Sequence, residues 1–246
     1  MHVFLETERL ILRRFTAGDV DNLVGLDADP DVMRFVSGGT PTSRDAIENE
    51  FLPAFLGYYQ RYQAFGFWAA IEKPTGDFLG WFHFRPRHGS APDQVELGYR
   101  MRKSAWGKGY ATEGSRALIR KGFTESGVQC VTAEAMAANI ASRRVMEKAG
   151  LSLVRTFTQP GPDATGGHLI EVVEYALNKA DWEKRIGIVN RGHHGSLCVS
   201  AETLAAHDPA NQSAKATAHH ARPMRHGRAF PRKRFVKACT SRFRET

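Results

Sequence analysis

The sequence predicts an α+β fold, in which strands and amphipathic helices are interspersed along most of the 246 residues. Residues 94–101, QVELGYRM, place an apolar side chain at every second position, as in a strand with one buried face. Residues 65–72 and 78–86 are two further strand-like segments, and the Pro and Gly of the KPTGD that joins them favour a turn. These two segments are therefore expected to form a hairpin.

The N-terminal part is predicted to contain one strand and two helical stretches. Residues 10–15, LILRRF, form the first expected strand. Apolar side chains recur at helical intervals within residues 17–33, where Pro30 interrupts any continuation of the helix. They recur again within residues 44–62, and Pro53 is expected to kink or split that helix.

The C-terminal part continues with alternating helices and strands. After the glycine-containing stretch at residues 104–114, a helix is expected to about Ser126, because apolar residues from Ala111 onward follow one stripe of it. The remaining elements are a strand, a helix and two strands, at residues 128–136, 138–151, 151–158 and 168–177.

Charge divides the chain into two expected parts. Residues 1–186 carry 23 basic and 23 acidic side chains, whereas residues 187–246 carry 11 basic and 3 acidic side chains. The second part also lacks hydrophobic periodicity, so it offers too little apolar surface to offset the entropy of ordering. We therefore predict a folded domain at residues 1–186 and a basic, disordered tail at residues 187–246.

The spacing of the cysteines and the hydropathy of the chain indicate the compartment in which the protein acts. The three cysteines are far apart, and their spacing predicts neither a disulfide framework nor a metal site. No run of about 18 apolar residues predicts a membrane span, and the N-terminus lacks the pattern of an export signal. These observations predict a cytoplasmic protein that uses no metal and no membrane.

Residues 104–114, SAWGKGYATEG, indicate an anion-binding turn between a strand and a helix. The first N–H groups of such a helix are unpaired, and Gly107 and Gly109 allow the backbone to approach an anion closely. Arg102, Lys103 and Lys108 add positive charge. The glycine spacing differs from the patterns of nucleoside-triphosphate and dinucleotide loops. From these residues alone, a plain Gly-rich turn is an equally good interpretation.

Two longer segments resemble the Gcn5-related N-acetyltransferase (GNAT) superfamily. They are VELGYRMRKSAWGKGYATEG at residues 95–114 and AANIASRRVMEKAGL at residues 137–151, and the resemblance extends from residue 6 to residue 178. The branch that they resemble contains the ribosomal-protein N-terminal acetyltransferases (RimJ/RimL-like). The resemblance implies a mixed, mostly antiparallel sheet flanked by helices, in which a bulged strand at 94–101 splays away from the strand at 128–136.

The resemblance also implies that acetyl-CoA lies between these two strands with its pyrophosphate on the Gly-rich loop. Main-chain groups near Met101 would hold the pantetheine, and Asn139 would contact the pantetheine arm as well as capping a helix. The superfamily pattern usually has Gln or Arg where this chain has Ser104. The residues that would bind the pyrophosphate are Trp106, Gly107, Lys108, Gly109, Tyr110, Ala111 and Thr112, with Arg102 beside them.

Acetyl transfer requires a neutral amine, a stabilised oxyanion and a stabilised CoA thiolate. Glu96 matches an acidic position that many relatives use as a base, directly or through water; its alternative role is a carboxylate that is solvated or paired with an arginine such as Arg100. Ser142 matches a serine near the CoA sulfur, with helix packing as its alternative role. Met146 stands where many relatives have a tyrosine acid, and a thioether has no proton to donate.

The expected activity is acetyl transfer to a primary amine, on a protein N-terminus or a small molecule, by direct attack in a ternary complex. Neither the acceptor nor the choice between monomer and homodimer follows from the resemblance. A second hypothesis is a catalytically weak acyl-CoA-binding protein that associates with nucleic acid through basic residues such as PRKRF at 231–235. The tail would otherwise be an aberrant extension of the chain.

Overall fold

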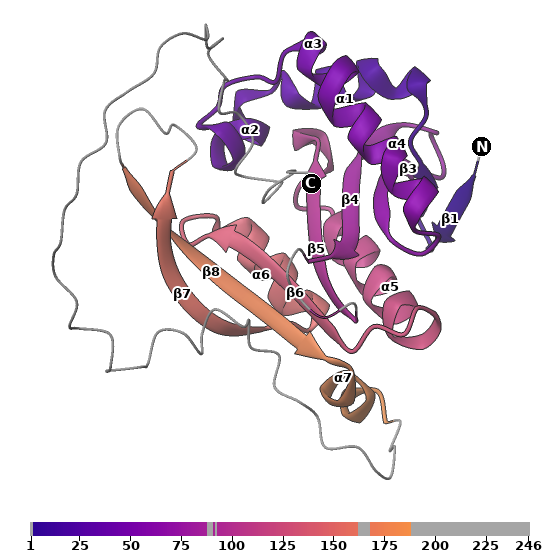
Figure 1. Cartoon of the computed structure of the whole chain (residues 1–246), viewed down its shortest axis with the longest axis vertical. Coiled ribbons are helices and arrows are strands. Elements are labelled where there is room, and N and C mark those ends of the chain that lie inside the picture. Colours follow the sequence, from indigo (N-terminus) through magenta and orange to yellow (C-terminus); the bar gives the residue numbers. More distant parts are fainter. Residues whose placement is uncertain (1, 88–90, 92, 162–167, 188–246) are drawn as a thin grey trace, which may run out of the picture. The chain divides into compact units, whose positions relative to one another are not determined.

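One eight-stranded sheet organises the part of the chain that the structure describes. The computed structural model describes residues 2–87, 91, 93–161 and 168–187. Across the sheet the strands follow the order β1-β2-β3-β4-β5-β6-β8-β7 (Figure 1). Neighbouring strands are antiparallel except β5 and β6, which are parallel. The strands are β1 Val3–Glu6, β2 Leu10–Arg14, β3 Gly66–Glu72, β4 Phe78–Pro86, β5 Gln94–Met101, β6 Cys130–Met136, β7 Ser152–Pro160 and β8 Leu169–Asn178.

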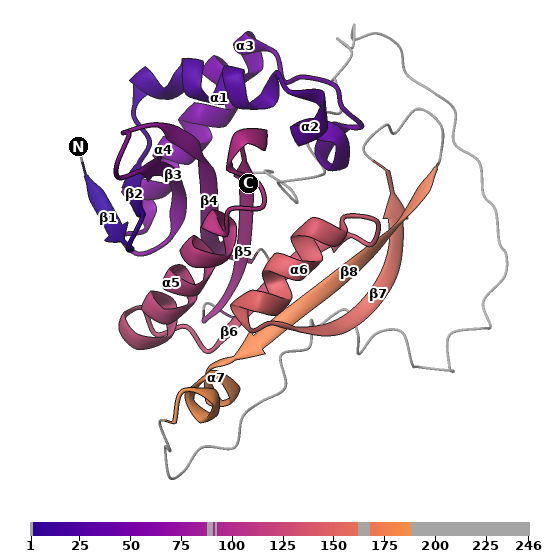
Figure 2. The same ribbon diagram turned by 180° about the vertical axis from the view of Figure 1, so that it is seen from behind.

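Helices lie on both faces of this sheet. Figure 1 shows α1 and α4 in front of β3 and β4, and Figure 2 shows α5 and α6 on the opposite face. The helices are α1 Val20–Asp27, α2 Pro30–Ser37, α3 Arg44–Ala46, α4 Leu52–Arg61, α5 Tyr110–Glu125, α6 Ile140–Ala149 and α7 Lys179–Arg185. The mixed sheet and its two helical layers confirm the predicted α+β fold.

Three details of the N-terminal part differ from the sequence prediction. Residues 3–6 pair with β2 as β1, a strand that the prediction did not include. Two residues separate the end of α1 at Asp27 from Pro30, which is the first residue of α2. A proline is tolerated at the first position of a helix, because its φ suits the helix and its missing N–H would have no partner there. Pro53 follows a π-helical turn at Ile47–Phe51, which lets the helix continue into α4 around the N–H that proline lacks.

Helix α5 lies close to the sheet because two of its residues have no side chain. A Cβ atom at Gly114 would lie 2.3 Å from Cζ of Phe82, and one at Gly122 would lie 2.6 Å from Cζ of Phe84. Both phenylalanines belong to β4 and are fully buried. The contact fixes the position of α5, and with it the loop that precedes the helix.

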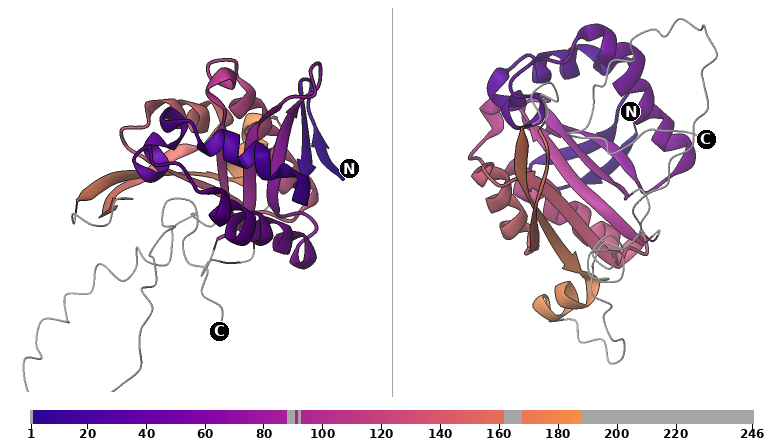
Figure 3. Two further views of the ribbon diagram at one scale, coloured as in Figure 1. Left: turned by 90° about the horizontal axis from the view of Figure 1, so that it is seen from above. Right: turned by 60° about the vertical axis from the view of Figure 1, so that its left-hand side comes forward.

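Helices α1 to α4 cover the other face only over its N-terminal strands. Phe55 of α4 stacks on Phe67 of β3, with ring centroids 3.9 Å apart. Asp27, at the end of α1, accepts a hydrogen bond of 2.6 Å from Arg100 of β5. β8 and β7 end the sheet on the side opposite β1 (Figure 3).

β5 and β6 stay together for only three residue pairs. Residues 94–96 pair in parallel with residues 130–132. Beyond Glu96, β5 continues along β4, while β6 continues along β8. We call residues 97–101 and 133–136, where the two strands part, the β5–β6 fork. The splaying agrees with the resemblance, but the implied bulge does not, because β4 and β5 pair in unbroken register from Gly80–Met101 to Pro86–Val95.

Within the described ranges, no helix has the length and apolar character needed to cross a bilayer. The predicted tail at residues 187–246 lies outside the described residues apart from Gly187.

Candidate functional site

The loop between β5 and α5 places unpaired N–H groups beside the β5–β6 fork. A short 3₁₀ turn at Lys103–Ala105 is followed by Gly107 and Gly109, whose φ angles of 73° and 85° favour glycine. Gly109 is the N-cap of α5, and no side chain caps this helix. The first N–H groups of α5 are therefore available to a ligand, and the helix macrodipole favours an anion there.

Arg9, in the turn between β1 and β2, holds this loop in place. Its Nη1 donates to the carbonyl oxygen of Lys108 over 3.0 Å, and its Nη2 lies 2.6 Å from the Glu113 carboxylate in the first turn of α5. The guanidinium also lies over the ring of Tyr110, 4.4 Å from the centroid. Tyr110 donates in turn to Glu72 of β3. The loop is thus braced by Arg9 of the β1–β2 turn and by Glu72 of β3.

Two basic residues that the sequence prediction placed around the anion contact other partners. The Arg102 guanidinium lies over the ring of Phe78, 5.3 Å from the centroid, and Lys103 Nζ pairs with Asp31 of α2. Positive charge beside the loop comes instead from a groove of about 780 Å³ that reaches Gly109 and also contains glutamates. The basic residues that line this groove are Arg9, Arg116, Arg120, Lys121 and Lys148.

Trp106 closes the loop onto β5. Its indole Nε1 donates to the carbonyl oxygen of Met101 over 2.9 Å, while 47% of the residue stays exposed. The N–H of Arg102 donates to Leu79 of β4, so strand alternation turns the main-chain groups of Met101 away from β4 and toward the fork. The main-chain groups of Tyr99, two residues earlier, point to the same side.

The N-terminus of α6 forms the other side of the fork. Asn139 Oδ1 accepts a hydrogen bond of 3.1 Å from the N–H of Ser142, so the capping role that the sequence suggested for Asn139 is confirmed. Tyr99 Oη donates to the carbonyl oxygen of Ser142 over 2.9 Å and lies 3.1 Å from its Oγ. Met146, one turn further along α6, is 1% exposed and belongs to the hydrophobic core. Residues 142 and 146 lie on the same side of α6, so the side chain one turn beyond Ser142 is a thioether, which has no proton to donate.

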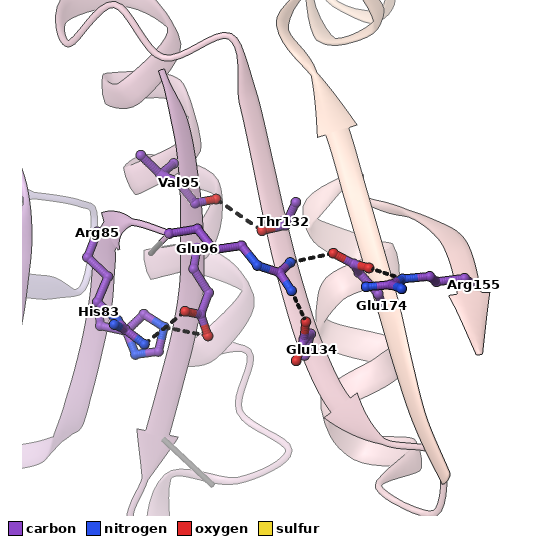
Figure 4. A network of polar contacts seen from close by, with 9 residues as sticks. His83, Arg85, Val95, Glu96, Thr132, Glu134, Arg155 and Glu174 are labelled. Atoms are coloured by element: carbon purple, nitrogen blue, oxygen red, sulfur yellow. Dashed lines mark hydrogen bonds and ion pairs between the residues drawn. The ribbon is translucent and has the colours of Figure 1, made fainter. Parts of the chain in front are cut away.

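The opposite face of the sheet carries a network of charged side chains beside the fork (Figure 4). Arg85 of β4 donates to Glu96 of β5 over 2.8 Å, and the other Glu96 oxygen lies 3.6 Å from Nε2 of His83. Burial alone would raise the pKa of Glu96, but His83 and the neighbouring arginines outweigh burial and lower the pKa to about 2. Arg100, the partner considered from the sequence, pairs with Asp27 instead.

Arg87 extends this network to β6 and β8. Its Nη2 lies 2.6 Å from Glu134 of β6, and its Nη1 contacts Glu174 of β8, which Arg155 of β7 also contacts. Burial raises the pKa of Glu134; Glu96 and Glu174 add to the rise, and Arg87 opposes it. Glu134 is therefore easier to protonate than Glu96, which suits a proton acceptor better.

The two faces of the fork differ in chemistry. Tyr99 and Glu96 are an odd number of residues apart on β5, so their side chains lie on opposite faces of the sheet. The face of α5 and α6 offers N–H groups and the hydroxyls of Tyr99 and Ser142, which suit an anionic, thioester-bearing ligand. The face of Glu96 and Glu134 offers carboxylates, which suit an amine. A group held in the fork is accessible from both faces of the sheet.

Sequence reasoning did not find Arg9, Tyr99, His83 or Glu134 as residues of this site. Arg9 and its partner Glu113 are 104 residues apart, and no pattern in the sequence links them. Tyr99 did carry a signal, since it is the one hydroxyl-bearing residue on the apolar face of residues 94–101. Among the described residues, no three or more His, Cys, Asp or Glu side chains are grouped in a way that would hold a metal ion.

Known proteins resemble this chain in sequence and in fold. Residues 9–152 match the family described as acetyltransferase (GNAT) domain. A relative from Aspergillus fumigatus, named FsC-acetyl coenzyme A-N(2)-transacetylase, is 33% identical over 168 residues, which cover 64% of this chain and 68% of the relative. An acetyltransferase (GNAT family) from Bacillus anthracis has a TM-score of 0.60 at 23% identity, covering 73% of this chain and 99% of its own.

A ribosomal-protein alpha-N-acetyltransferase, RimL, in complex with coenzyme A has a TM-score of 0.60 at 15% identity, covering 72% of this chain and 98% of its own. The two structures share the fold, and the family match spans more than half of the chain. The resemblance drawn from the two sequence segments is confirmed. The chain belongs to the GNAT family and is an acetyl-CoA-dependent N-acetyltransferase.

Proposed function

We propose that this enzyme transfers the acetyl group directly to a primary amine, with acetyl-CoA and the amine meeting in the β5–β6 fork from opposite faces of the sheet. The observation that carries the proposal is the parting of β5 and β6 after Glu96, with a braced anion loop on one face and a carboxylate network on the other. Both reactants can then be bound at once, and no acetylated enzyme is needed.

The cofactor is held chiefly by backbone groups in this proposal. The pyrophosphate accepts hydrogen bonds from the loop and the start of α5, at residues Trp106, Gly107, Lys108, Gly109, Tyr110, Ala111 and Thr112. The pantetheine follows the unpaired edge of β5 near Met101 and reaches Asn139 at the start of α6. The carbonyl oxygen of Met101 already accepts a hydrogen bond from the Trp106 indole. Arg102 contributes at longer range, because its guanidinium lies over Phe78.

The acceptor nitrogen must lose a proton before or during attack. A lysine-like amine has a pKa of about 10.4, whereas an α-amino group has a pKa of about 7.7–8. An α-amino group can therefore be deprotonated by a weaker base. Glu96 stays ionised and attracts the amine, and it acts on the proton through water rather than directly, because its ion pair with Arg85 makes it a weak base. Glu134 lies beside it as a stronger acceptor.

The acceptor is proposed only as an amine class. One relative is named for transfer to an N(2) atom, and one structural neighbour is named as a ribosomal-protein alpha-N-acetyltransferase. The first name specifies a nitrogen atom, and the second specifies the α-amino group of a ribosomal protein. The proposals of cytoplasmic location and of a monomer or homodimer rest on the sequence alone.

The test is an acceptor screen in which release of the CoA thiol is followed with peptides bearing free α-amino groups and with small amines. Initial velocities with varied acetyl-CoA and acceptor should give intersecting lines, as a ternary complex requires. Parallel lines, together with label retained on the protein after incubation with radiolabelled acetyl-CoA alone, would contradict direct transfer.

The basic excess of residues 187–246 supports a second candidate function, in which weak catalysis is combined with nucleic-acid binding. A shortened protein that ends at residue 186 distinguishes these two candidate functions. Unchanged turnover by the shortened chain favours the enzyme as proposed. Salt-sensitive nucleic-acid binding that disappears on shortening, with no turnover in the full chain, favours the second candidate.

A further inference from the structure

The hydroxyl of Tyr99 joins the two sides of the β5–β6 fork. Tyr99 belongs to β5 beyond the last residue that pairs with β6, and Ser142 belongs to the first turn of α6. Tyr99 Oη donates to the carbonyl oxygen of Ser142 over 2.9 Å and lies 3.1 Å from Ser142 Oγ. Ser142 N–H donates to Asn139 Oδ1, which fixes the start of α6, and the contacts with Tyr99 show that the Ser142 Oγ faces β5.

A phenol and a serine hydroxyl have complementary capacities at this distance. Each has one proton to donate and lone pairs that accept, so either one can be the donor in the contact between Oη and Oγ. When no ligand is bound, Tyr99 donates to the Ser142 carbonyl oxygen. When a sulfur atom lies beside Ser142, the serine proton turns to the sulfur, and the Tyr99 proton is free to turn to Oγ.

Burial keeps Tyr99 in its neutral form. It raises the pKa of the Tyr99 phenol, and the contact with Ser142 lowers the pKa by less. A phenol of this kind does not give up its proton at neutral pH. Its contribution is a hydrogen bond of fixed direction rather than an acid.

Resting on the proposed function, we propose that Tyr99 is a positioning residue that orients the Ser142 hydroxyl to stabilise the departing CoA thiolate. In the step concerned, the amine nitrogen forms a bond to the acetyl carbon, the carbon–sulfur bond breaks, and its electron pair stays on sulfur. The amine proton leaves to water on the carboxylate face. Ser142 donates a hydrogen bond to the sulfur, Tyr99 donates one to Ser142 Oγ, and neither loses its proton.

The position of Met146 explains why a second hydroxyl is needed from β5. Met146 is buried in the core and offers no proton, so α6 supplies a hydroxyl to the fork only through Ser142. Tyr99 supplies the other from the facing strand, and its ring is held in place next to Phe82, 6.2 Å between centroids.

The first experiment is the change Tyr99→Phe, which removes only the hydroxyl. We expect kcat to fall about tenfold, as for the loss of one hydrogen bond, with KM for acetyl-CoA within about twofold of wild type. Tyr62→Phe, which removes a hydroxyl from an exposed tyrosine, is the matched control and should keep wild-type kcat. Thermal unfolding of both variants should show that the fold is intact.

A double-mutant cycle with Ser142→Ala separates positioning from a structural role. In the Ser142→Ala background, Tyr99→Phe should have almost no further effect on kcat, because Oγ is already absent. Independent, multiplying losses would overturn the proposal, as would an unchanged kcat in Tyr99→Phe. A rise in KM with unchanged kcat would overturn it too.

A spectroscopic readout tests the thiolate directly. The ultraviolet absorbance of the thiolate of bound CoA is titrated in the wild type and in Tyr99→Phe, and we expect the thiol pKa to be about one unit higher in the variant. Equal thiol pKa values would overturn the proposal while leaving the proposed function intact. Failure of the wild-type protein to bind CoA in calorimetry would overturn the proposed function itself.

Discussion

Gly109 stands where the loop becomes α5, with a φ of 85° and with Arg9 Nη2 3.4 Å from the position that a Cβ would occupy. A side chain at this residue projects into the region proposed for the pyrophosphate. The charge of that side chain should therefore matter more than its size, and the residue offers an isosteric pair of substitutions that separates the two.

Gly109→Asp should weaken acetyl-CoA binding at least tenfold, because its carboxylate competes for the N–H groups of α5 and repels phosphate. Gly109→Asn adds almost the same volume and the same backbone strain without the charge, so it should lose much less affinity. Calorimetric titration with CoA measures both. Equal losses in the two variants would show that the pyrophosphate does not lie at this helix end.

The residues of the site differ in how well the sequence could predict them. Gly107, Gly109 and Asn139 were predicted because their roles are local: positive φ angles and a helix cap depend on neighbours within a few residues. Arg102 and Lys103 were expected beside the anion because of their charge. Their actual partners, Phe78 and Asp31, are fixed by the packing of distant elements, which no local pattern reveals.

At the scale of elements, Asp19 joins β2 to the start of α1. Burial alone would raise the pKa of its carboxyl, but hydrogen bonds from Arg13, from Thr16 and from Asn22 outweigh burial and lower it to about 2. The folded-state pKa lies below the unfolded value. The stability from this group is therefore fully present above pH 4 to 5, and it is lost as pH falls toward about 2.

Asp19→Asn should lower the free energy of unfolding at pH 7 by about 2 kcal/mol, and the difference from wild type should shrink as pH falls. Asp21→Asn is the matched control: the side chain is 84% exposed and pairs with Arg44, so it should change stability by less than about 1 kcal/mol. Urea unfolding between pH 7 and pH 2.5 measures both. A constant difference across this range would contradict the assignment of the shift to Asp19.

The close contact of α5 with β4 gives a second prediction for an element. Gly114→Ala should destabilise the protein by about 1–3 kcal/mol, because Phe82 is fully buried and its ring has no space to move away from the added methyl group. Gly57→Ala in α4 meets nothing within 4 Å and should stabilise by up to about 1 kcal/mol. Chemical denaturation distinguishes the signs. Stabilisation by both changes would mean that α5 is not packed this closely.

At the scale of the whole molecule, the order and type of most elements could be predicted from periodicity and turn residues. The interruption of the first helical region at Pro30 was predicted, but the short β1 and the new helix that begins at Pro30 were not. Val3–Glu6 pairs only with β2 and is too short for a clear alternation, and Pro30 fits the start of a helix as well as the end of one. The parting of β5 from β6 came from the resemblance rather than from any single segment, and the order of the strands in the sheet was not predicted.

Ligand binding should stabilise the whole domain, because the proposed cofactor site lies between two parts of the sheet that share only three residue pairs. At about 100 times its Kd, CoA should add about 2.7 kcal/mol to the free energy of unfolding, which raises Tm by about 5–10 °C. Scanning calorimetry measures the shift, and Gly109→Asp should abolish most of it at the same CoA concentration. No shift in a wild-type protein that turns over acetyl-CoA would place the cofactor elsewhere.

The parallel pairing of β5 with β6 also bears on how the chain reaches its native state. Antiparallel neighbours such as β3 and β4 are joined by a short turn. By contrast, β5 and β6 are separated in the sequence by the whole of α5, so they can pair only after this segment has folded back. Such non-local pairing carries a larger loop-closure entropy and forms more slowly than a hairpin. The residues that would hold both reactants are thus expected to be the last to assemble, so a partly folded chain would have no premature acetyltransferase activity.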